Sequence, residues 1–590
     1  MSHRAHLFSL RLAHAMRESL SETPYRPSTL SRDVMAGITV GIIAIPLSMA
    51  LAIASGVAPQ YGLYTACIAG FLIPFTGGSR FSVSGPTAAF VVVLYPVVQK
   101  YGLAGLLITT MLAGAMLIAM ALLRMGRYIE YIPESVTLGF TGGIAVVIAT
   151  LQLKDFLGLG IVTMPEHFTD KVLALTAAFP SFSPWALLVG TTTLAVILLW
   201  PRLKTAIPAY LPAILVGSVA ALLLNQQGHT VATINSTFSF ALPDGSAGTG
   251  IPSLLPSLEW PWSRSQPGER ALTFSWVLAQ DLLASAFAIA MLAAIESLLC
   301  AVILDGMTGK KHSANSELLG QGIGNIVAPL FGGITATAAI ARSAANVRAG
   351  AQSPVAAMVH AVVVLMALIS LTRLLGYLPM TSMAAMLFAV AWNMSEAPKA
   401  WHLVKTAPAS DTLVFITCFS FTILFDMVIA ITAGIVLASL LFVKEMAEMT
   451  KVHDITANKK LVDVSTPPDW AVLKVNGPLF FAAADRIFGE LSLLCGNKKG
   501  LVLYLDGVSI LDAGGVAALT KFIGKCRQSG TQLWLADLQF QPLKTLAKAG
   551  FKPEPGVCTI YPTLTEALNN LLLSTESMAV QAQTRNIIAT

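Results

Sequence analysis

The sequence predicts a polytopic α-helical membrane protein with a small cytoplasmic α/β domain at its C-terminal end. Three observations predict this fold class. The chain of 590 residues is 55% hydrophobic and only 12% charged, whereas a soluble protein carries about 25% charged residues. Residues 34–79 contain no Asp, Glu, Lys, Arg or His, which is enough for two membrane spans of about 20 residues each. After Lys444 the composition becomes polar.

The basic residues predict the orientation of the chain. Residues 1–32 carry five arginines but lack the apolar core and the cleavage site of a signal peptide, so we expect a cytoplasmic N-terminal region. Further basic residues fall in the loops after alternate predicted spans, and the long connection 225–270 has no lysine. Because cytoplasmic loops are enriched in Lys and Arg, both termini are expected inside, with an even number of spans between them.

The C-terminal part divides into segments of different composition. We expect a transmembrane domain over 33–446, a charged linker over 447–469, an α/β domain over 470–572 and a tail over 573–590. The α/β domain has predicted strands at 471–481, 500–508 and 531–537 and predicted helices at 513–530 and 541–550. The six cysteines have no metal-ligand spacing, and we see no P-loop and no GxSxG. No cofactor, metal, enzymatic activity or nucleic-acid binding is therefore expected.

Arg342 is the residue that a membrane interpretation has to explain. It follows the charge-free run 318–341, and such a charge in hydrocarbon costs about 3 kcal/mol on insertion scales. Two stretches, 77–95 and 332–350, begin with Gly-Gly and continue through small and hydroxyl residues, as broken helices around a cavity do. Pro86 suits the first turn of a helix. Two helix starts beside Arg342 would attract an anion, whereas an ion pair with Glu296 or snorkelling to the surface is the structural alternative.

Glu296 lies in the middle of the apolar run 284–305. A neutral carboxylic acid costs far less than its anion in such a place, so Glu296 can take up a proton and is a candidate proton-coupling residue. The alternative is a hydrogen bond to the backbone of a broken helix. Asp426 is expected to mark an external turn between two spans, and His360 is expected to be an ordinary helix residue rather than a proton relay.

At these motifs the chain resembles the SulP family of anion permeases. The residues that carry the resemblance are "AGITVGIIAIPLSMALA" (36–52), "GVAPQYGLYTA" (56–66), "GGSRFSVSGPTAAF" (77–90), "AIESLLCAVILDGMTG" (294–309), "NSELLGQGIGNIVAPLFGGI" (315–334) and "ARSAANVRAG" (341–350). The stretch "LDGVSILDAGGVAAL" (505–519) resembles the STAS module that closes these proteins. Within the family, the nearest likeness is to bacterial transporters that import the C4-dicarboxylates succinate, fumarate and aspartate.

The resemblance implies fourteen segments in two inverted repeats of seven, divided into a core and a gate subdomain that move past each other like an elevator. It implies half-helices that start near Gly85–Pro86 and Ala341–Arg342 with the substrate between them. The implied substrate-binding residues are Leu47, Gly85, Pro86, Thr87, Ala341, Arg342 and Ser343. Glu296 would match the glutamate that is tied to proton coupling in symporting members. A homodimer in the bacterial inner membrane, surrounded by membrane lipid, is also implied.

Three positions depart from the family pattern. Many members have Gln at the position of Leu47 and Ser at the position of Ala341, so a less polar pocket is expected here, which suits a substrate with a hydrocarbon middle. Gly514 replaces the Ser or Thr that is phosphorylated in STAS signalling proteins. We therefore predict proton-coupled import of a small organic dianion of the C4-dicarboxylate class. The alternatives are a sulfate or bicarbonate carrier of the same fold, and a membrane scaffold whose STAS domain recruits a cytoplasmic protein partner.

Overall fold

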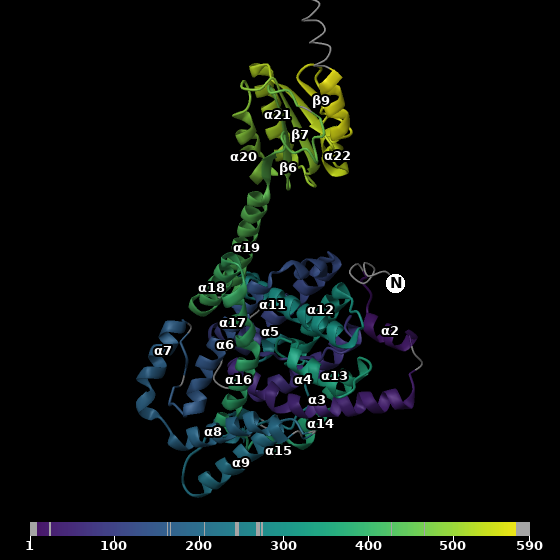
Figure 1. Ribbon diagram of the computed structural model, residues 1–590. Coiled ribbons are helices and arrows are strands. Elements are labelled where there is room, and N and C mark those ends of the chain that lie inside the picture. The colour runs from purple at the N-terminus through teal and green to yellow at the C-terminus, as the bar shows by residue number, and fades with distance from the viewer. Residues whose placement is uncertain are drawn as a thin grey trace, which may run out of the picture. The chain divides into compact units, whose positions relative to one another are not determined.

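The computed structural model describes residues 9–22, 25–161, 163–165, 167–203, 205, 207–241, 247–266, 272, 275–425, 427–464 and 466–573. The chain divides into two compact units, Met1–Ile435 and Val436–Thr590 (Figure 1). The first unit is almost entirely helical, and the second is built on a β-sheet. Asp426, for which an external turn was predicted, lies outside the described residues.

When its shorter and broken segments are counted together with its long apolar helices, the first half of the membrane unit contains the seven segments that the resemblance implies. Its helices are α2 (His14–Glu22), α3 (Pro27–Ala54), α4 (Pro59–Thr76), η1 (Ala88–Phe90), α5 (Val91–Leu122), η2 (Met125–Tyr131), α6 (Glu134–Leu157), α7 (Phe168–Ala177), η3 (Phe179–Ser181), α8 (Pro184–Leu199), η4 (Trp200–Leu203) and α9 (Tyr210–Gln226). Gly102 inside α5 has a φ of 64°, which a helix cannot contain, so α5 is two segments. The seven are α3, α4, both parts of α5, α6, α8 and α9.

The second half gives the same count when the short helix α13 is included. Its helices are α10 (Ile234–Thr237), η5 (Pro261–Ser263), α11 (Trp276–Thr308), α12 (Ala314–Leu330), α13 (Ile340–Arg348), α14 (Val355–Ser370), α15 (Thr372–Leu375), α16 (Met380–Ser395), α17 (Ala397–Thr406), α18 (Ala409–Leu424) and α19 (Met427–Met449). A short hairpin, β2 (Ser239–Ala241) and β3 (Ala247–Thr249), precedes α11. The seven candidate segments are α11, α12, α13, α14, α16, α18 and α19. Among the described residues, six helices are long and apolar enough to cross a membrane by length and composition, which agrees with the predicted polytopic helical domain.

The helices of the membrane unit pack in two groups. In the first, α3, α4, α5, α11, α12, α13 and α14 contact one another, and we call this group the core. In the second, α6, α8, α9, α16 and α18 contact one another, and we call this group the gate. Each group combines helices from both halves of the sequence, as two interlocked repeats require.

The second unit is a five-stranded sheet with the order β5-β6-β7-β8-β9. Its elements are β5 (Lys451–Asp454), β6 (Trp470–Asn476), α20 (Phe481–Ser492), β7 (Gly500–Gly507), α21 (Ala513–Ser529), β8 (Gln532–Ala536), α22 (Phe540–Lys548) and β9 (Cys558–Tyr561), and residues 564–573 are helical. Strand β5 runs antiparallel to β6, and the other neighbours are parallel. Apolar clusters cover both faces of the sheet.

Two boundaries differ from the sequence predictions. The segment 447–469, predicted as a linker, contributes β5 to the sheet. The residues of β5 are mostly exposed because β5 is an edge strand of the sheet, so the composition of this strand resembles that of a loop. The predicted strand 471–481 ends at Asn476, because Gly477 has a φ of 106° and the chain turns there into α20.

Candidate anion-binding site

Two short strands from opposite halves of the chain meet in the core. Strand β1 (Ser84–Gly85) pairs antiparallel with β4 (Thr337–Ala338), and all four residues are buried. Helical structure resumes directly after each strand, in η1 and α5 on one side and in α13 on the other. The two broken segments predicted from the Gly-Gly stretches therefore bring two helix starts to one place.

Both helix starts offer backbone N–H groups. Neither η1 nor α13 has a side-chain cap, and the first N–H groups of a helix have no partner inside it. The nine-residue α13 also carries a partial positive charge at its start. The electrostatics of this place therefore favour an anion before any side chain is considered.

Arg342 lies in the first turn of α13, and only 2% of its surface is exposed. One guanidinium nitrogen, Nη2, donates to the carbonyl oxygen of Pro86 across the strand pair. Nε and Nη1 have no hydrogen-bond partner in the described part of the chain. A Cβ atom on Gly85 would lie 2.7 Å from Nη1, so a glycine is needed for the guanidinium to lie against β1.

Glu296 lies in the middle of α11 and is partly exposed. Its Oε2 accepts a hydrogen bond of 3.0 Å from the hydroxyl of Thr87, the residue before η1. Among the described residues it forms no ion pair with Arg342, whose guanidinium is bonded to the Pro86 carbonyl instead. The carboxyl group is thus hydrogen-bonded to the start of one half-helix, and the guanidinium belongs to the start of the other.

The remaining predicted site residues have different surroundings. Leu47 is buried directly after Pro46 in α3, which packs against α13. Ala341 is exposed at the start of α13. Ser343 is buried, and its hydroxyl accepts a hydrogen bond of 2.9 Å from the backbone N–H of Val83. The Ser343 side chain thus fixes the backbone that leads into β1.

His360 is buried in α14, and its Nδ1 lies 3.3 Å from the carbonyl oxygen of Ala357 in the same helix. A Cβ atom on Gly70 would lie 3.2 Å from the imidazole Cε1. The His360 side chain therefore packs against α4 near Gly70, close to β1.

A buried carboxylate, Glu317, was not among the predicted site residues. Only 1% of its surface is exposed, and it accepts hydrogen bonds from the N–H groups of Gly78 (3.0 Å) and Ser79 (2.9 Å) and from the amide of Gln321 (3.0 Å). The same amide lies 3.3 Å from the Ser84 hydroxyl in β1. Glu317 immediately precedes the charge-free run, and nothing in the sequence marks it as buried.

The loop before β4 is held in a similar way. The Asn325 side-chain amide donates a hydrogen bond to the carbonyl of Ala336 and accepts one from its N–H, each at 2.8 Å. The Thr65 hydroxyl accepts a 2.7 Å hydrogen bond from the N–H of Ile334. Thus Glu317, from the second half of the chain, holds the loop before β1, and Thr65, from the first half, helps to hold the loop before β4.

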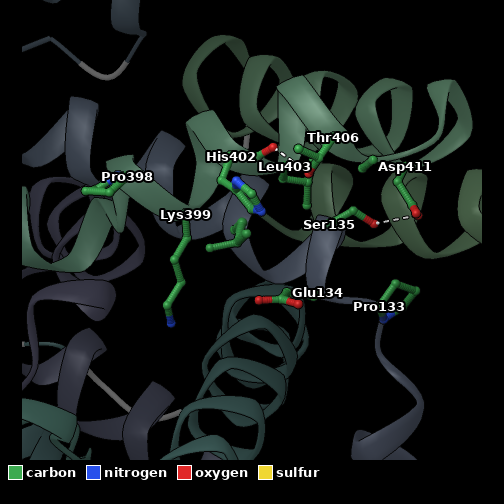
Figure 2. Close-up of a pocket in the computed structure, with 11 residues that line it drawn as sticks. Pro133, Glu134, Ser135, Pro398, Lys399, His402, Leu403, Thr406 and Asp411 are labelled. Carbon is green, nitrogen blue, oxygen red and sulfur yellow. Dashed lines mark hydrogen bonds between the residues drawn. The ribbon is translucent and has the colours of Figure 1, made fainter.

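A separate cavity lies in the gate, between the starts of α6 and α18 and the helix α17 (Figure 2). Its volume is about 540 Å³, and Glu134, Lys399, His402 and Asp411 are among its lining residues. The hydrogen bond from Lys399 to Glu396 raises the pKa of this lysine. The lining holds two carboxylates, and its one lysine is already paired with Glu396, so this cavity is a poor site for a dianion. None of the predicted site residues lines it.

Comparisons with known proteins match almost the whole chain. A family model described as the sulfate permease family matches residues 30–418, and a STAS domain model matches residues 462–567. The chain is 37% identical over 527 residues to "Putative sulfate transporter YvdB" of Bacillus subtilis (strain 168), covering 89% of this chain and 95% of that protein. It is 26% identical over 572 residues to "Bicarbonate transporter BicA" of Picosynechococcus sp. (strain ATCC 27264 / PCC 7002 / PR-6), covering 92% and 94%.

Solved structures support the same fold. The structure titled "The overall structure of SLC26A9" superposes with a TM-score of 0.79 at 16% identity, over 95% of this chain and 93% of that one. "The transmembrane domain of a cyanobacterium bicarbonate transporter BicA" superposes with a TM-score of 0.58 at 26% identity, over 71% of this chain and 98% of that one.

Proposed function

We propose a substrate and a coupling ion for this chain, which belongs to the sulfate permease (SulP) family of anion transporters and ends in a STAS domain. The proposed substrates are C4-dicarboxylates, namely succinate, fumarate and aspartate. They are imported together with protons across the bacterial inner membrane, with both termini of the chain in the cytoplasm and the protein acting as a homodimer.

This proposal rests on the unpaired hydrogen-bond donors of the buried Arg342 side chain. A cation removed from water and left without a counter-charge loses several kcal/mol of solvation. Arg342 is buried, and two of its three guanidinium nitrogens have no partner among the described residues. A bound anion would supply the missing acceptors, and the uncapped starts of η1 and α13 add to the attraction.

The predicted site residues favour an organic anion. Leu47 and Ala341 offer no hydrogen-bonding group, and Thr87 donates its hydroxyl to Glu296. A sulfate ion has four oxygens around one centre and needs polar groups on every side. A dicarboxylate places its charge at two ends and tolerates apolar contact along its hydrocarbon middle.

Coupling to protons follows from the membrane potential. A dianion that enters a cell against 100 mV meets a penalty of about 4.6 kcal/mol, which is twice the value for one charge. Import with two protons is electroneutral. Glu296 carries one proton as the core moves, and a singly protonated substrate carries the other.

The test is uptake of labelled succinate into proteoliposomes of the purified protein under an inward proton gradient. Accumulation that excess fumarate blocks, that excess sulfate spares and that Glu296→Gln abolishes supports the proposal. Uptake that is insensitive to pH and to a protonophore excludes proton coupling. Absence of succinate uptake alongside sulfate or bicarbonate uptake excludes the proposed substrate.

A second candidate is transport of sulfate or bicarbonate. It is favoured by the names of two relatives, a putative sulfate transporter and a bicarbonate transporter. Substrate competition separates the two anions, and dependence on sodium would favour bicarbonate. A scaffold that acts through a protein partner of its STAS domain is tested by deleting residues 447–590, because a transporter should still bind its substrate without them.

A further inference from the structure

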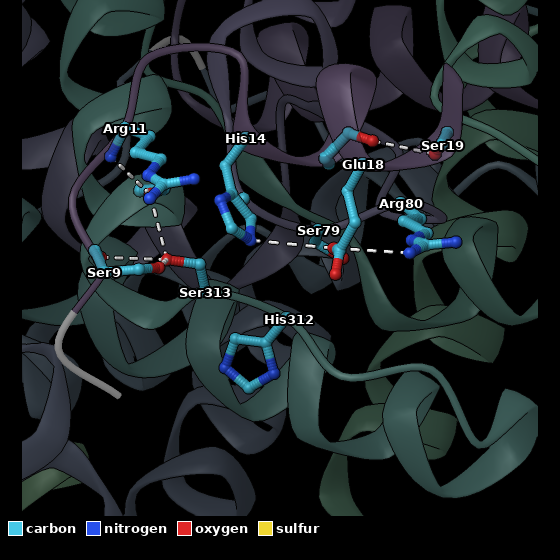
Figure 3. Close-up of polar contacts among 12 residues, drawn as sticks. Ser9, Arg11, His14, Glu18, Ser19, Ser79, Arg80, His312 and Ser313 are labelled. Atoms are coloured by element: carbon cyan, nitrogen blue, oxygen red, sulfur yellow. Dashed lines mark hydrogen bonds and ion pairs between the residues drawn. The ribbon is translucent and has the colours of Figure 1, made fainter. Parts of the chain in front are cut away.

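The N-terminal residues 9–22, which we call the strap, lie against the core rather than apart from it (Figure 3). The Ser9 hydroxyl oxygen is 2.6 Å from that of Ser313, and the Ser313 hydroxyl also lies 3.0 Å from the Ser9 carbonyl. The backbone N–H of Arg11 donates to the Ser316 hydroxyl at 3.0 Å. The first part of the strap is therefore bonded to the beginning of α12.

The middle of the strap is bonded to the end of α4. The N–H groups of Ala13 and Ala15 donate to the carbonyl oxygens of Thr76 (2.8 Å) and Gly77 (3.2 Å). Ala15 is completely buried. Ala13 has a φ of 55°, a left-handed conformation that is unfavourable for residues other than glycine. The surrounding contacts hold the backbone there in spite of this cost.

Helix α2 completes the strap with an ionic contact. The Glu18 carboxylate lies 3.3 Å from the guanidinium of Arg80 and 3.6 Å from the imidazole of His14, and Figure 3 shows it between these two groups. Only 7% of the Arg80 side chain is exposed. Arg80 belongs to the loop 77–83, which runs from α4 to β1.

The same loop is held from its other side by α12. Glu317 accepts the N–H groups of Gly78 and Ser79, and the N–H of Ser313 donates to the carbonyl of Gly78 at 3.1 Å. The loop therefore lies between the strap and α12. Only three residues separate Arg80 from Ser84, the first residue of β1.

We propose that the strap is a positioning element of the anion site. By holding the loop 77–83 through Glu18 and Arg80, it fixes the strand pair against which the Arg342 guanidinium lies. All its contacts named above are with the core, so the strap travels with the core during transport. Its detachment loosens β1 and weakens anion binding without preventing the movement of core against gate.

The first measurement is hydrogen exchange on the full chain in lipid nanodiscs, which needs no substrate. Glu18→Gln is expected to speed exchange in peptides covering residues 76–85, and exchange in the STAS domain should stay unchanged. Glu445→Gln, which removes an exposed charge from α19, is the matched control and should alter neither region. Unchanged exchange over residues 76–85 in Glu18→Gln would overturn the proposal, whatever anion the protein carries.

The second measurement is uptake of whichever of succinate, sulfate and bicarbonate the wild type transports. Glu18→Gln should raise KM by about threefold, as expected for a partly exposed ion pair, while kcat stays the same. The reversed pair, Glu18→Arg with Arg80→Glu, should return both KM and the amide exchange over residues 76–85 to their wild-type values. A fall in kcat with unchanged KM contradicts a positioning role.

A reversible cross-link distinguishes the effect of strap docking from the effect of the Glu18 charge. Because the Ser9 and Ser313 hydroxyls are in contact, the pair Ser9→Cys and Ser313→Cys should form a disulfide. In the Glu18→Gln background, the oxidised pair should restore KM, and dithiothreitol should remove the rescue. An oxidised pair that blocks transport would mean that the strap has to detach in each cycle, which overturns the proposal.

Discussion

Gly85→Ala is the substitution that tests the anion site most directly. The added Cβ atom would lie 2.7 Å from Nη1 of Arg342 and 3.4 Å from its Cζ and Nη2. Gly85 is not among the glycines with a positive φ, so alanine fits the backbone without strain. The guanidinium is therefore the group that has to move, by several tenths of an ångström.

The size of the effect follows from what the guanidinium would lose. A hydrogen bond to a charged group contributes about 1.5–3 kcal/mol. Displacement of Nη1 removes one such bond to the anion. Because about 1.4 kcal/mol corresponds to a factor of ten in affinity, the dissociation constant should rise by about tenfold to a hundredfold.

Isothermal titration of the transported anion into the purified full chain in nanodiscs measures this change. Gly306→Ala is a matched control in α11, because a Cβ atom there would meet nothing within 4 Å. Both variants should keep the melting temperature of the wild type to within a few degrees, as expected for small changes in stability. Wild-type affinity in Gly85→Ala, or an equal loss in both variants, would refute the placement of the anion beside Arg342.

Three further predictions concern the proton and the STAS domain. Uptake should rise as external pH falls, because proton binding to Glu296 precedes import, and Glu296→Gln should abolish the proton-driven accumulation in proteoliposome assays. Asp512 accepts hydrogen bonds from the N–H groups of Gly515 (2.7 Å) and Phe481 (3.1 Å). Asp512→Ala should therefore lower the free energy of unfolding of the STAS domain by about 1–2 kcal/mol and speed amide exchange in α21. Burial raises the pKa of the Cys558 thiol to about 12, so this cysteine should resist iodoacetamide at neutral pH until the domain unfolds, as read by mass spectrometry.

The polytopic helical character of the membrane unit could be predicted from composition, whereas the number of its segments, its repeats and the helix starts near Gly85–Pro86 and Ala341–Arg342 were implied by the family resemblance. Charge-free runs mark membrane segments, and the Gly-Gly stretches marked both broken helices. Helical structure resumes at Ala88 and Ile340, close to the expected starts at Gly85–Pro86 and Ala341–Arg342. What the sequence could not provide was which side chain bonds to which loop, since contacts such as Glu317 with Gly78 and Thr65 with Ile334 join residues more than two hundred positions apart.

Glu317 and the strap show the physical reason for these omissions. Glu317 is 239 positions from its partner Gly78, and nothing in the local pattern of α12 distinguishes a buried carboxylate from a charge at a helix end. The strap belongs to residues 1–32, whose five arginines suggested a cytoplasmic N-terminal region. Its docking depends mainly on backbone N–H groups and serine hydroxyls, which any sequence of similar polarity possesses.

The separation of Arg342 from Glu296 bears on how an anion and a proton could be coupled. If the two side chains formed an ion pair, a substrate would have to break it before binding. Here Glu296 is bonded to Thr87 and the guanidinium to Pro86, so the two charges belong to opposite half-helix starts. On the proposed mechanism, an anion at Arg342 adds negative charge near Glu296 and so favours its protonated form. Linkage then requires that the proton favours the anion by the same factor, which is the thermodynamic condition for symport.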